Sequence, residues 1–136
     1  MLAILSWNIQ FGLGVDGRID LARIARVAHA LGDADVLCFQ EVSAGFAEHD
    51  HGADQAAQLA SLFPGHAPMF APAVDRGPAP RRRFGNLILS RLPILEFVAH
   101  ALPRPADGSV THMQRQALEV SVAAGAAALR IVTTHL

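Results

Sequence analysis

At 136 residues the chain has the length of one domain and is long enough to bury a hydrophobic core. Hydrophobic residues make up 51% of it and charged residues only 17%, a composition that excludes an intrinsically disordered protein. The formal net charge of −1 excludes a strongly basic nucleic-acid coat, although it allows a local basic patch. We therefore expect a single domain over residues 1–136.

Two further features narrow the class of protein. Cys38 is the only cysteine, which excludes an internal disulfide and a zinc cluster of several thiolates, and we expect a buried strand thiol there. No segment approaches the ~18 consecutive apolar residues of a membrane span. Residues 1–5 are apolar but lack the basic region of a signal peptide, so we expect a cytoplasmic protein.

The first part of the chain predicts a strand, a helix and a second strand. Residues 3–7 form an apolar run that leads into Asn8, and residues 36–40 form another that ends on Glu41. Asp20 predicts the cap of the helix between them, whose expected inward face consists of Leu21, Ile24, Val27, Ala28 and Leu31. Because a connection of this kind makes the two strands parallel, Asn8 and Glu41 should emerge at the same sheet edge.

The rest of the chain predicts a helix over residues 54–63 and strands over residues 66–71, 84–90, 94–99, 114–122 and 129–134. Residues 43–51 and 72–83 are predicted loops. In the first loop, the cluster His49-Asp50-His51 is expected to be solvated rather than metal-binding. In the second loop, the run Arg81-Arg82-Arg83 either grips phosphate through bidentate hydrogen bonds or is simply solvated, and the sequence leaves both alternatives open.

Polar residues stand at the ends of several predicted strands: Asn8, Glu41, Asn86, Arg115 and His135. This set suits chemistry on a phosphate. Amide and carboxylate oxygens hold a hard cation such as Mg²⁺, which polarises a phosphoryl oxygen. An arginine pairs with the phosphate, and a histidine serves as an acid–base or hydrogen-bonding group.

The same residues carry a resemblance to a known family. Ser6-Trp7-Asn8-Ile9, Gln40-Glu41-Val42, the segment 85–91, Arg115-Gln116-Ala117 and Thr134-His135-Leu136 resemble successive motifs of the endonuclease/exonuclease/phosphatase superfamily. Each motif alone is weak, but together and in order they are specific. The resemblance implies an α/β fold: half of a DNase I-like four-layer α/β sandwich, with one mixed sheet and helices packed on one face.

The resemblance covers only the first half of the family's domain. The family's Gly-Asp-x-Asn motif and its closing Asp-His pair are missing from this sequence, so we expect an incomplete domain without its C-terminal half. Such a half should leave one apolar sheet face uncovered, which is costly in water. We therefore expect the chain to associate with itself through an exposed apolar sheet face.

The resemblance also implies roles for individual residues. Asn8 and Glu41 would be ligands or near-ligands of Mg²⁺, with Mn²⁺ as an alternative. Asn86 and Arg115 would support catalysis and bind substrate. His135 would contact the scissile phosphate or help protonate the leaving group, and Gln40 would lie behind Glu41 or face the substrate.

The predicted function is that of a Mg²⁺-dependent phosphoester hydrolase, which uses metal-assisted in-line attack by water on DNA, a phospholipid head group or a small phosphoester. We expect activity only together with the C-terminal half. One alternative is a non-catalytic half-domain with a binding or structural role. Another alternative is a plain α/β scaffold without a site. Side chains of Asn8 and Glu41 that point apart would favour this alternative.

Overall fold

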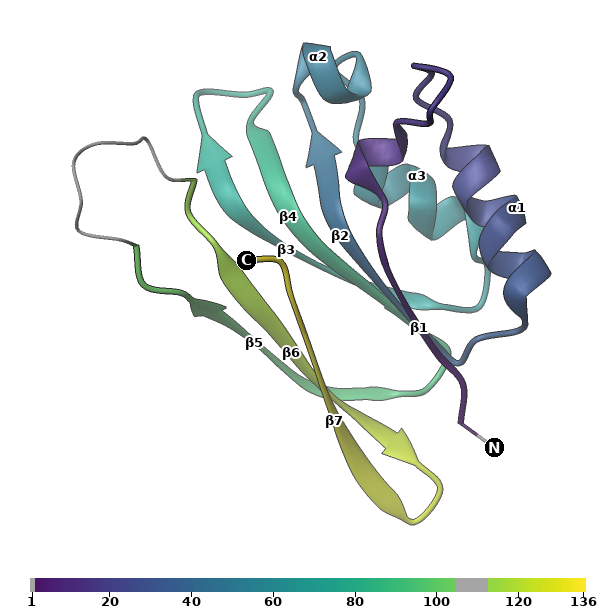
Figure 1. The fold of residues 1–136 in the computed structure, drawn as a ribbon. Helices are drawn as coiled ribbons and strands as arrows, with labels where there is room; N and C mark the ends of the chain where they lie inside the picture. The colour runs from purple at the N-terminus through teal and green to yellow at the C-terminus, as the bar shows by residue number, and fades with distance from the viewer. Residues whose placement is uncertain (1, 105–112) are drawn as a thin grey trace.

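The structure, a computed structural model, describes residues 2–104 and 113–136. Its strands form two sheets, as Figure 1 shows. A four-stranded sheet has the order β1 (Ile4–Asn8), β2 (Val36–Ala44), β4 (Arg82–Ser90) and β3 (Ala67–Arg76). A three-stranded sheet has the order β5 (Ile94–Ala101), β6 (Gln116–Ala124) and β7 (Ala127–Thr134). The helices are α1 (Leu21–Leu31), α2 (Ala47–Asp50), α3 (Gln55–Leu62) and the short 3₁₀ helix η1 (Gln10–Gly12).

The first sheet is mixed, and its parallel pair is the predicted one. β1 and β2 run parallel with Asn8 opposite Gln40, and α1 connects them. The other pairs, β2 with β4 and β4 with β3, are antiparallel. The strand–helix–strand unit predicted from the sequence is therefore confirmed, and it brings the ends of β1 and β2 to one edge.

Helices α1 and α3 cover one face of the mixed sheet (Figure 1). Asp20 caps α1 as predicted, because its Oδ1 accepts a hydrogen bond from the backbone N–H of Arg23 at 2.8 Å. The predicted inward face of α1 is wrong at two positions: Val27 is 40% exposed and Leu31 is 72% exposed. The sheet and α3 reach only the stripe that carries Leu21, Ile24, Ala25 and Ala28, so the flanks of the helix stay in water.

The opposite face of the mixed sheet is covered by the second sheet, so the chain builds two sheets where one mixed sheet was expected. Val36 and Cys38 of β2 and Ile88 of β4 pack against the inward row of β6. That row, Leu118, Val120 and Val122, is fully buried, as its alternation in the sequence predicts. The face that was expected to be bare is thus buried within the chain. The buried thiol of Cys38 is confirmed.

Both predicted loops contain regular structure. β2 continues to Ala44 and is followed by α2, while β3 runs through Pro72 to Arg76 and β4 begins at Arg82. Pro72 is tolerated because β3 is an edge strand, where a missing N–H breaks no hydrogen bond to a neighbour. Within the part of the chain that the structure describes, no helix is long and apolar enough to span a membrane.

The expectation of a solvated cluster at residues 49–51 is wrong for Asp50. Its carboxylate is buried and accepts hydrogen bonds from Ser43 Oγ at 2.6 Å, from Phe46 N at 2.9 Å and from Gly52 N at 2.7 Å. These bonds hold the turn around α2 against the end of β2. Asp50 is therefore a structural carboxylate, with its oxygens already occupied by protein donors.

Candidate active site

Four polar side chains from both sheets meet at one edge of the molecule. Asn8 ends β1, Glu41 lies in β2, Arg115 directly precedes β6 and His135 directly follows β7. The chain end that carries His135 lies near the start of β6 (Figure 1). Residues that are far apart in the sequence therefore come together only because the two sheets pack face to face.

Short distances join these side chains into one cluster. Asn8 Nδ2 donates a hydrogen bond to Glu41 Oε1 at 3.0 Å and lies 3.3 Å from His135 Nε2. His135 Nδ1 lies 3.4 Å from Glu41 Oε1 and 3.2 Å from Arg115 Nη1. The imidazole is thus placed between a carboxylate, an amide and a guanidinium. A scaffold in which Asn8 and Glu41 point apart is excluded.

The proton on His135 determines which of these contacts are hydrogen bonds. A neutral imidazole has one donor nitrogen and one acceptor nitrogen. When Nε2 accepts from Asn8, Nδ1 carries the proton and can donate to Glu41; when Nδ1 accepts from Arg115, the proton is on Nε2. Asn8 and Arg115 therefore compete for the lone pair of His135, and a change of partner moves its proton between the two nitrogens.

The backbone around the cluster is strained at non-glycine residues. Glu41 has φ 59° and lies where the register of β2 against β4 shifts, between Phe39 and Val42. Gln10 and Phe11 have φ 46° and 43°. A left-handed non-glycine residue costs on the order of 1 kcal/mol, and such residues gather at functional sites. The bulge lets Glu41 point to the open edge while its neighbour Gln40 stays buried.

The residues fit a hydrated Mg²⁺ ion held by one carboxylate. The Oδ1 of Asn8 accepts from the backbone N–H of Gln10 at 3.0 Å, so its amino group and not its oxygen faces Glu41. Mg²⁺ in proteins is commonly bound by one or two carboxylates and keeps several waters. Over residues 2–104 and 113–136 there is no group of three or more His, Cys, Asp or Glu side chains arranged for a metal. Glu41 is therefore the ligand candidate, and Asn8 orients it.

The other two predicted site residues lie beneath the cluster, between the sheets. Gln40 is 6% exposed and its Nε2 donates to Thr133 Oγ1 at 2.7 Å. Asn86 is also buried and donates from Nδ2 to the backbone oxygen of Gln116 at 3.0 Å. Asn86 still borders a shallow depression together with Glu41, Arg115 and His135. Gln40 does not border it, so its placement does not support a direct contact with substrate.

Thr133 and Gln116 belong to this site but are not predicted from the sequence. The signal was present in the alternation of their strands. Gln116 has the same parity as the inward Leu118, and Thr133 the same parity as the inward Ile131. A polar residue at an inward position has to find a partner across the interface, and both residues do.

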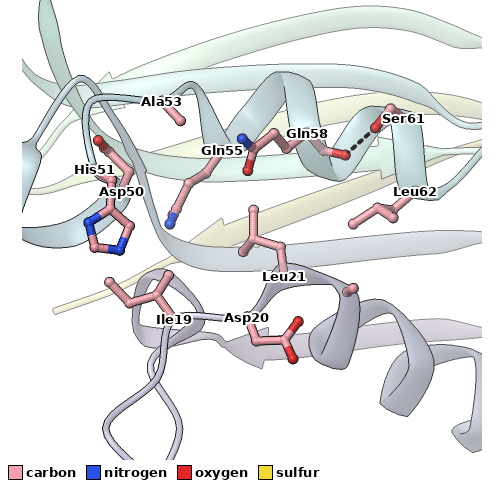
Figure 2. Close-up of a pocket in the computed structure, with 11 residues that line it drawn as sticks. Ile19, Asp20, Leu21, Asp50, His51, Ala53, Gln55, Gln58, Ser61 and Leu62 are labelled. Atoms are coloured by element: carbon pink, nitrogen blue, oxygen red, sulfur yellow. Dashed lines mark hydrogen bonds between the residues drawn. The ribbon is translucent and has the colours of Figure 1, made fainter.

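A pocket larger than this depression lies elsewhere, between the start of α1 and α3, with a volume of about 550 Å³ (Figure 2). None of the clustered polar residues lines it. Its buried polar side chains, Asp50 and Gln55, are bonded to the protein, and Ser61 donates to the backbone oxygen of Gln58 at 2.7 Å. Its size alone does not make it the chemical centre.

Comparisons with solved structures agree on the fold. "The crystal structure of endonuclease/exonuclease/phosphatase from Beutenbergia cavernae DSM 12333" is similar with a TM-score of 0.79 and 28% identity, over 99% of this chain and 38% of that one. An endonuclease/exonuclease/phosphatase family protein from Leptotrichia buccalis C-1013-b is similar with a TM-score of 0.67 and 13% identity, over 100% of this chain and 54% of that one. The chain thus spans well under two thirds of the length of either protein.

A search of curated protein sequences found no match. The profile of the Endonuclease/Exonuclease/phosphatase family, by contrast, matches residues 5–128, which include Asn8, Glu41, Asn86 and Arg115. The DNase I-like α/β architecture expected from the sequence is confirmed by the structural similarity. Members of the family hydrolyse phosphoesters and generally depend on a divalent metal. The chain belongs to the Endonuclease/Exonuclease/phosphatase family.

Proposed function

We propose that the chain forms the Glu41 side of the active site of a Mg²⁺-dependent phosphoester hydrolase, with Mn²⁺ as an alternative cation. The observation that carries this proposal is the cluster in which contacts of 3.0–3.4 Å join Asn8, Glu41 and His135 to one another and His135 to Arg115. Phosphoester hydrolysis needs a cation ligand, a positive charge for the phosphate and a group that transfers a proton. A carboxylate, a guanidinium and an imidazole supply these three.

Each side chain has a distinct part in the proposed reaction. Glu41 would hold the cation, which when bound polarises a phosphoryl oxygen and assists in-line attack by water. Asn8 keeps the Glu41 carboxylate in place through its amide. Arg115 pairs with a phosphate oxygen, and His135 holds the proton that the leaving group needs. Asn86, at the floor of the depression, supports Arg115 through its bond to Gln116.

The substrate we propose is DNA, a phospholipid head group or a small phosphoester. We expect activity only together with a C-terminal half, because the two similar structures are of much longer chains. The cytoplasm remains the expected location.

The decisive experiment measures hydrolysis of bis(p-nitrophenyl) phosphate with Mg²⁺ by wild type and by Glu41→Ala, in this chain and in any longer natural form. Glu48→Ala is the matched control, because Glu48 is an exposed carboxylate on α2 outside the cluster. We expect activity in the longer form, its loss in Glu41→Ala and its retention in Glu48→Ala. Activity that survives Glu41→Ala refutes the assignment of Glu41.

A non-catalytic half-domain is the second candidate function. The observation that favours it is that, among the residues that the structure describes, Glu41 is the one carboxylate of the cluster. Titration calorimetry with Mg²⁺ separates the candidates when combined with the hydrolysis assay. Binding of Mg²⁺ without hydrolysis in any form of the protein would favour the half-domain.

We also propose that the chain associates with itself. The mixed sheet is covered on both faces, so the contact is proposed on the second sheet, where Leu95, Phe97 and Val98 of β5 and Val132 of β7 are exposed. Val98 and Val132 are on the outward face, in register with Glu119 of β6, and exposed apolar side chains of this kind mark interaction surfaces.

A further inference from the structure

Two buried amide side chains flank the proposed site, one on each sheet. Gln40 directly precedes Glu41 in β2, and Gln116 directly follows Arg115 at the start of β6. They are only 6% and 8% exposed. A buried amide must find hydrogen-bond partners, because leaving it unsatisfied costs roughly 1–3 kcal/mol. The partners that these two amides find are across the interface between the sheets.

Gln116 joins three strands at one point. Its side-chain Nε2 donates to the backbone oxygen of Ala71 in β3. Its own backbone oxygen accepts from Asn86 Nδ2 of β4 at 3.0 Å and from Thr134 Oγ1 of β7 at 3.2 Å. Ala71 and Asn86 are paired in the register of β3 and β4, so both contacts reach the same place on the mixed sheet. Gln116 therefore ties the residue before His135 to the mixed sheet.

Gln40 makes the reciprocal connection from the mixed sheet. Its Nε2 donates to Thr133 Oγ1 at 2.7 Å, and it also lies within hydrogen-bond distance of Ser6 Oγ at 3.3 Å and Cys38 O at 3.2 Å. Thr133 stands two residues before His135. The strand that carries Glu41 and the strand that leads to His135 are thus joined directly beneath those two residues.

Apolar packing alone does not fix the position of the second sheet on the mixed sheet. The interface between Ile88 on one side and Leu118 and Val120 on the other is held by the hydrophobic effect, which has no direction. A small slide of one sheet would keep most of the buried area but would separate His135 from Asn8 and Glu41, which now lie 3.3 Å and 3.4 Å from its ring nitrogens. The same slide would break the bonds of Gln40 and Gln116, so these bonds oppose it.

We infer that Gln116 and Gln40 are positioning residues, which fix how the second sheet lies on the mixed sheet and so bring Arg115 and His135 to Glu41. The inference rests on the proposed function for its catalytic meaning. The position of His135 relative to the mixed sheet can be measured without an assay of hydrolysis.

The experiment uses Gln116→Leu, which removes the amide donor and keeps a side chain of similar size. The ¹⁵N signals of the His135 ring are recorded by NMR at one fixed pH, with Asn8→Ala as the reference for a lost contact between His135 and the mixed sheet. Ile131→Val is the matched control, because it trims the same interface without touching a polar contact. We expect the His135 signals of Gln116→Leu to shift toward those of Asn8→Ala, while Ile131→Val keeps the wild-type signals.

Wild-type His135 signals in folded Gln116→Leu would overturn the inference, even if the variant is less stable. If Gln116→Leu does not fold, Thr133→Val provides the same test, because it removes the partner of Gln40 and leaves Gln116 intact. Wild-type signals in that variant would overturn the inference equally. A shift of the His135 signals, together with no hydrolytic activity in any longer natural form, would support the positioning role and count against the proposed function. Wild-type His135 signals in the variants, together with hydrolysis by a longer natural form, would overturn the positioning role and leave the proposed function standing.

Discussion

The side-chain amide of Asn8 donates to Oε1 of Glu41 at 3.0 Å, so an amide and not a second acid stands beside the carboxylate of the cluster. The orientation of that amide is fixed by the bond from Gln10 N–H to its oxygen. Asn8 therefore presents hydrogen atoms to Glu41 and stabilises its negative charge.

Asn8→Asp should make the protein depend on a divalent cation for stability. The variant replaces a donor by a carboxylate next to Glu41, and like charges at this distance repel. We expect the free energy of unfolding without Mg²⁺ to fall by roughly 1–2 kcal/mol, within the usual range for single substitutions. Mg²⁺ should restore most of the loss. Urea titrations with and without Mg²⁺ measure both effects.

Asn8→Ala is the control for this prediction. It removes the same hydrogen bond without adding a charge, so its stability should change little with Mg²⁺. If Asn8→Asp proves as stable as wild type without Mg²⁺, the two side chains are not neighbours in solution.

His135→Gln should lower phosphodiester hydrolysis by about 10²-fold or more, the usual contribution of a general acid–base group. The assay uses whichever form of the protein hydrolyses bis(p-nitrophenyl) phosphate. His100→Gln is the matched control, because His100 is exposed on β5 and contacts Glu119 at 2.9 Å, outside the cluster. Equal losses in the two variants would show that the effect is not specific to His135.

Cys38 should make stability fall at high pH. Burial raises the pKa of its thiol from 9.0 to about 11. Since the unfolded chain releases the thiol proton first, the stabilisation is complete below pH 9 and is lost as the pH rises toward 11. We expect a loss of up to roughly 2–3 kcal/mol, because each pKa unit corresponds to about 1.4 kcal/mol.

Denaturant titrations between pH 8 and 11 test this prediction, with Cys38→Ala as the comparison. Cys38→Ala should be less stable at neutral pH but should lose less stability than wild type over the alkaline range. A thiol reagent should label Cys38 in the native protein only as fast as the protein opens. Rapid labelling of native protein at pH 8 would contradict the burial of the thiol.

Gly85→Ala should destabilise the protein strongly. A Cβ atom on Gly85 would overlap the backbone of β3, at Ala71 O, at Pro72 Cα (2.7 Å) and at Ala73 N (2.8 Å). Because backbone cannot yield as a side chain can, we expect a loss of about 1–3 kcal/mol, the usual cost of overpacking. Gly14→Ala is the matched control, since its Cβ would meet only side-chain atoms of Arg23 and Asp16, which can move away. Similar melting temperatures for the two variants would contradict the prediction.

Self-association should depend on the exposed apolar side chains of the second sheet. Sedimentation velocity of the chain at increasing concentration should detect dimers or larger species. Phe97→Ser should weaken that association, because the Phe97 side chain is 55% exposed in the isolated chain. Val15→Ser, in the exposed loop after β1, is the control. A wild-type protein that stays monomeric at all concentrations would contradict the proposal.

The sequence predicts well those features that depend on local patterns. The alternation around Leu118 identifies β6 and its inward face, Asp20 marks the start of α1, and the order of the first elements makes β1 and β2 parallel. The proximity of Asn8 and Glu41 then follows from the parallel pairing of β1 and β2. These inferences require only periodicity, capping and the handedness of connections.

The features that escape sequence analysis depend on tertiary contacts. The bulge that turns Glu41 outward is set by the register of β2 against β4, which the run of residues 36–40 does not encode. The second sheet folds back over the first, so Gln40 meets Thr133 instead of substrate. Leu31 is apolar and in helical phase, yet it is exposed because no described element packs over it.

The division of the polar cluster between two sheets has a consequence for how the chain folds. Asn8 and Glu41 come from one sheet, and Arg115 and His135 come from the other. A nascent or partly collapsed polypeptide therefore has no complete constellation. The four side chains come together only when the two sheets dock, so docking of the sheets is the folding step that assembles the cluster.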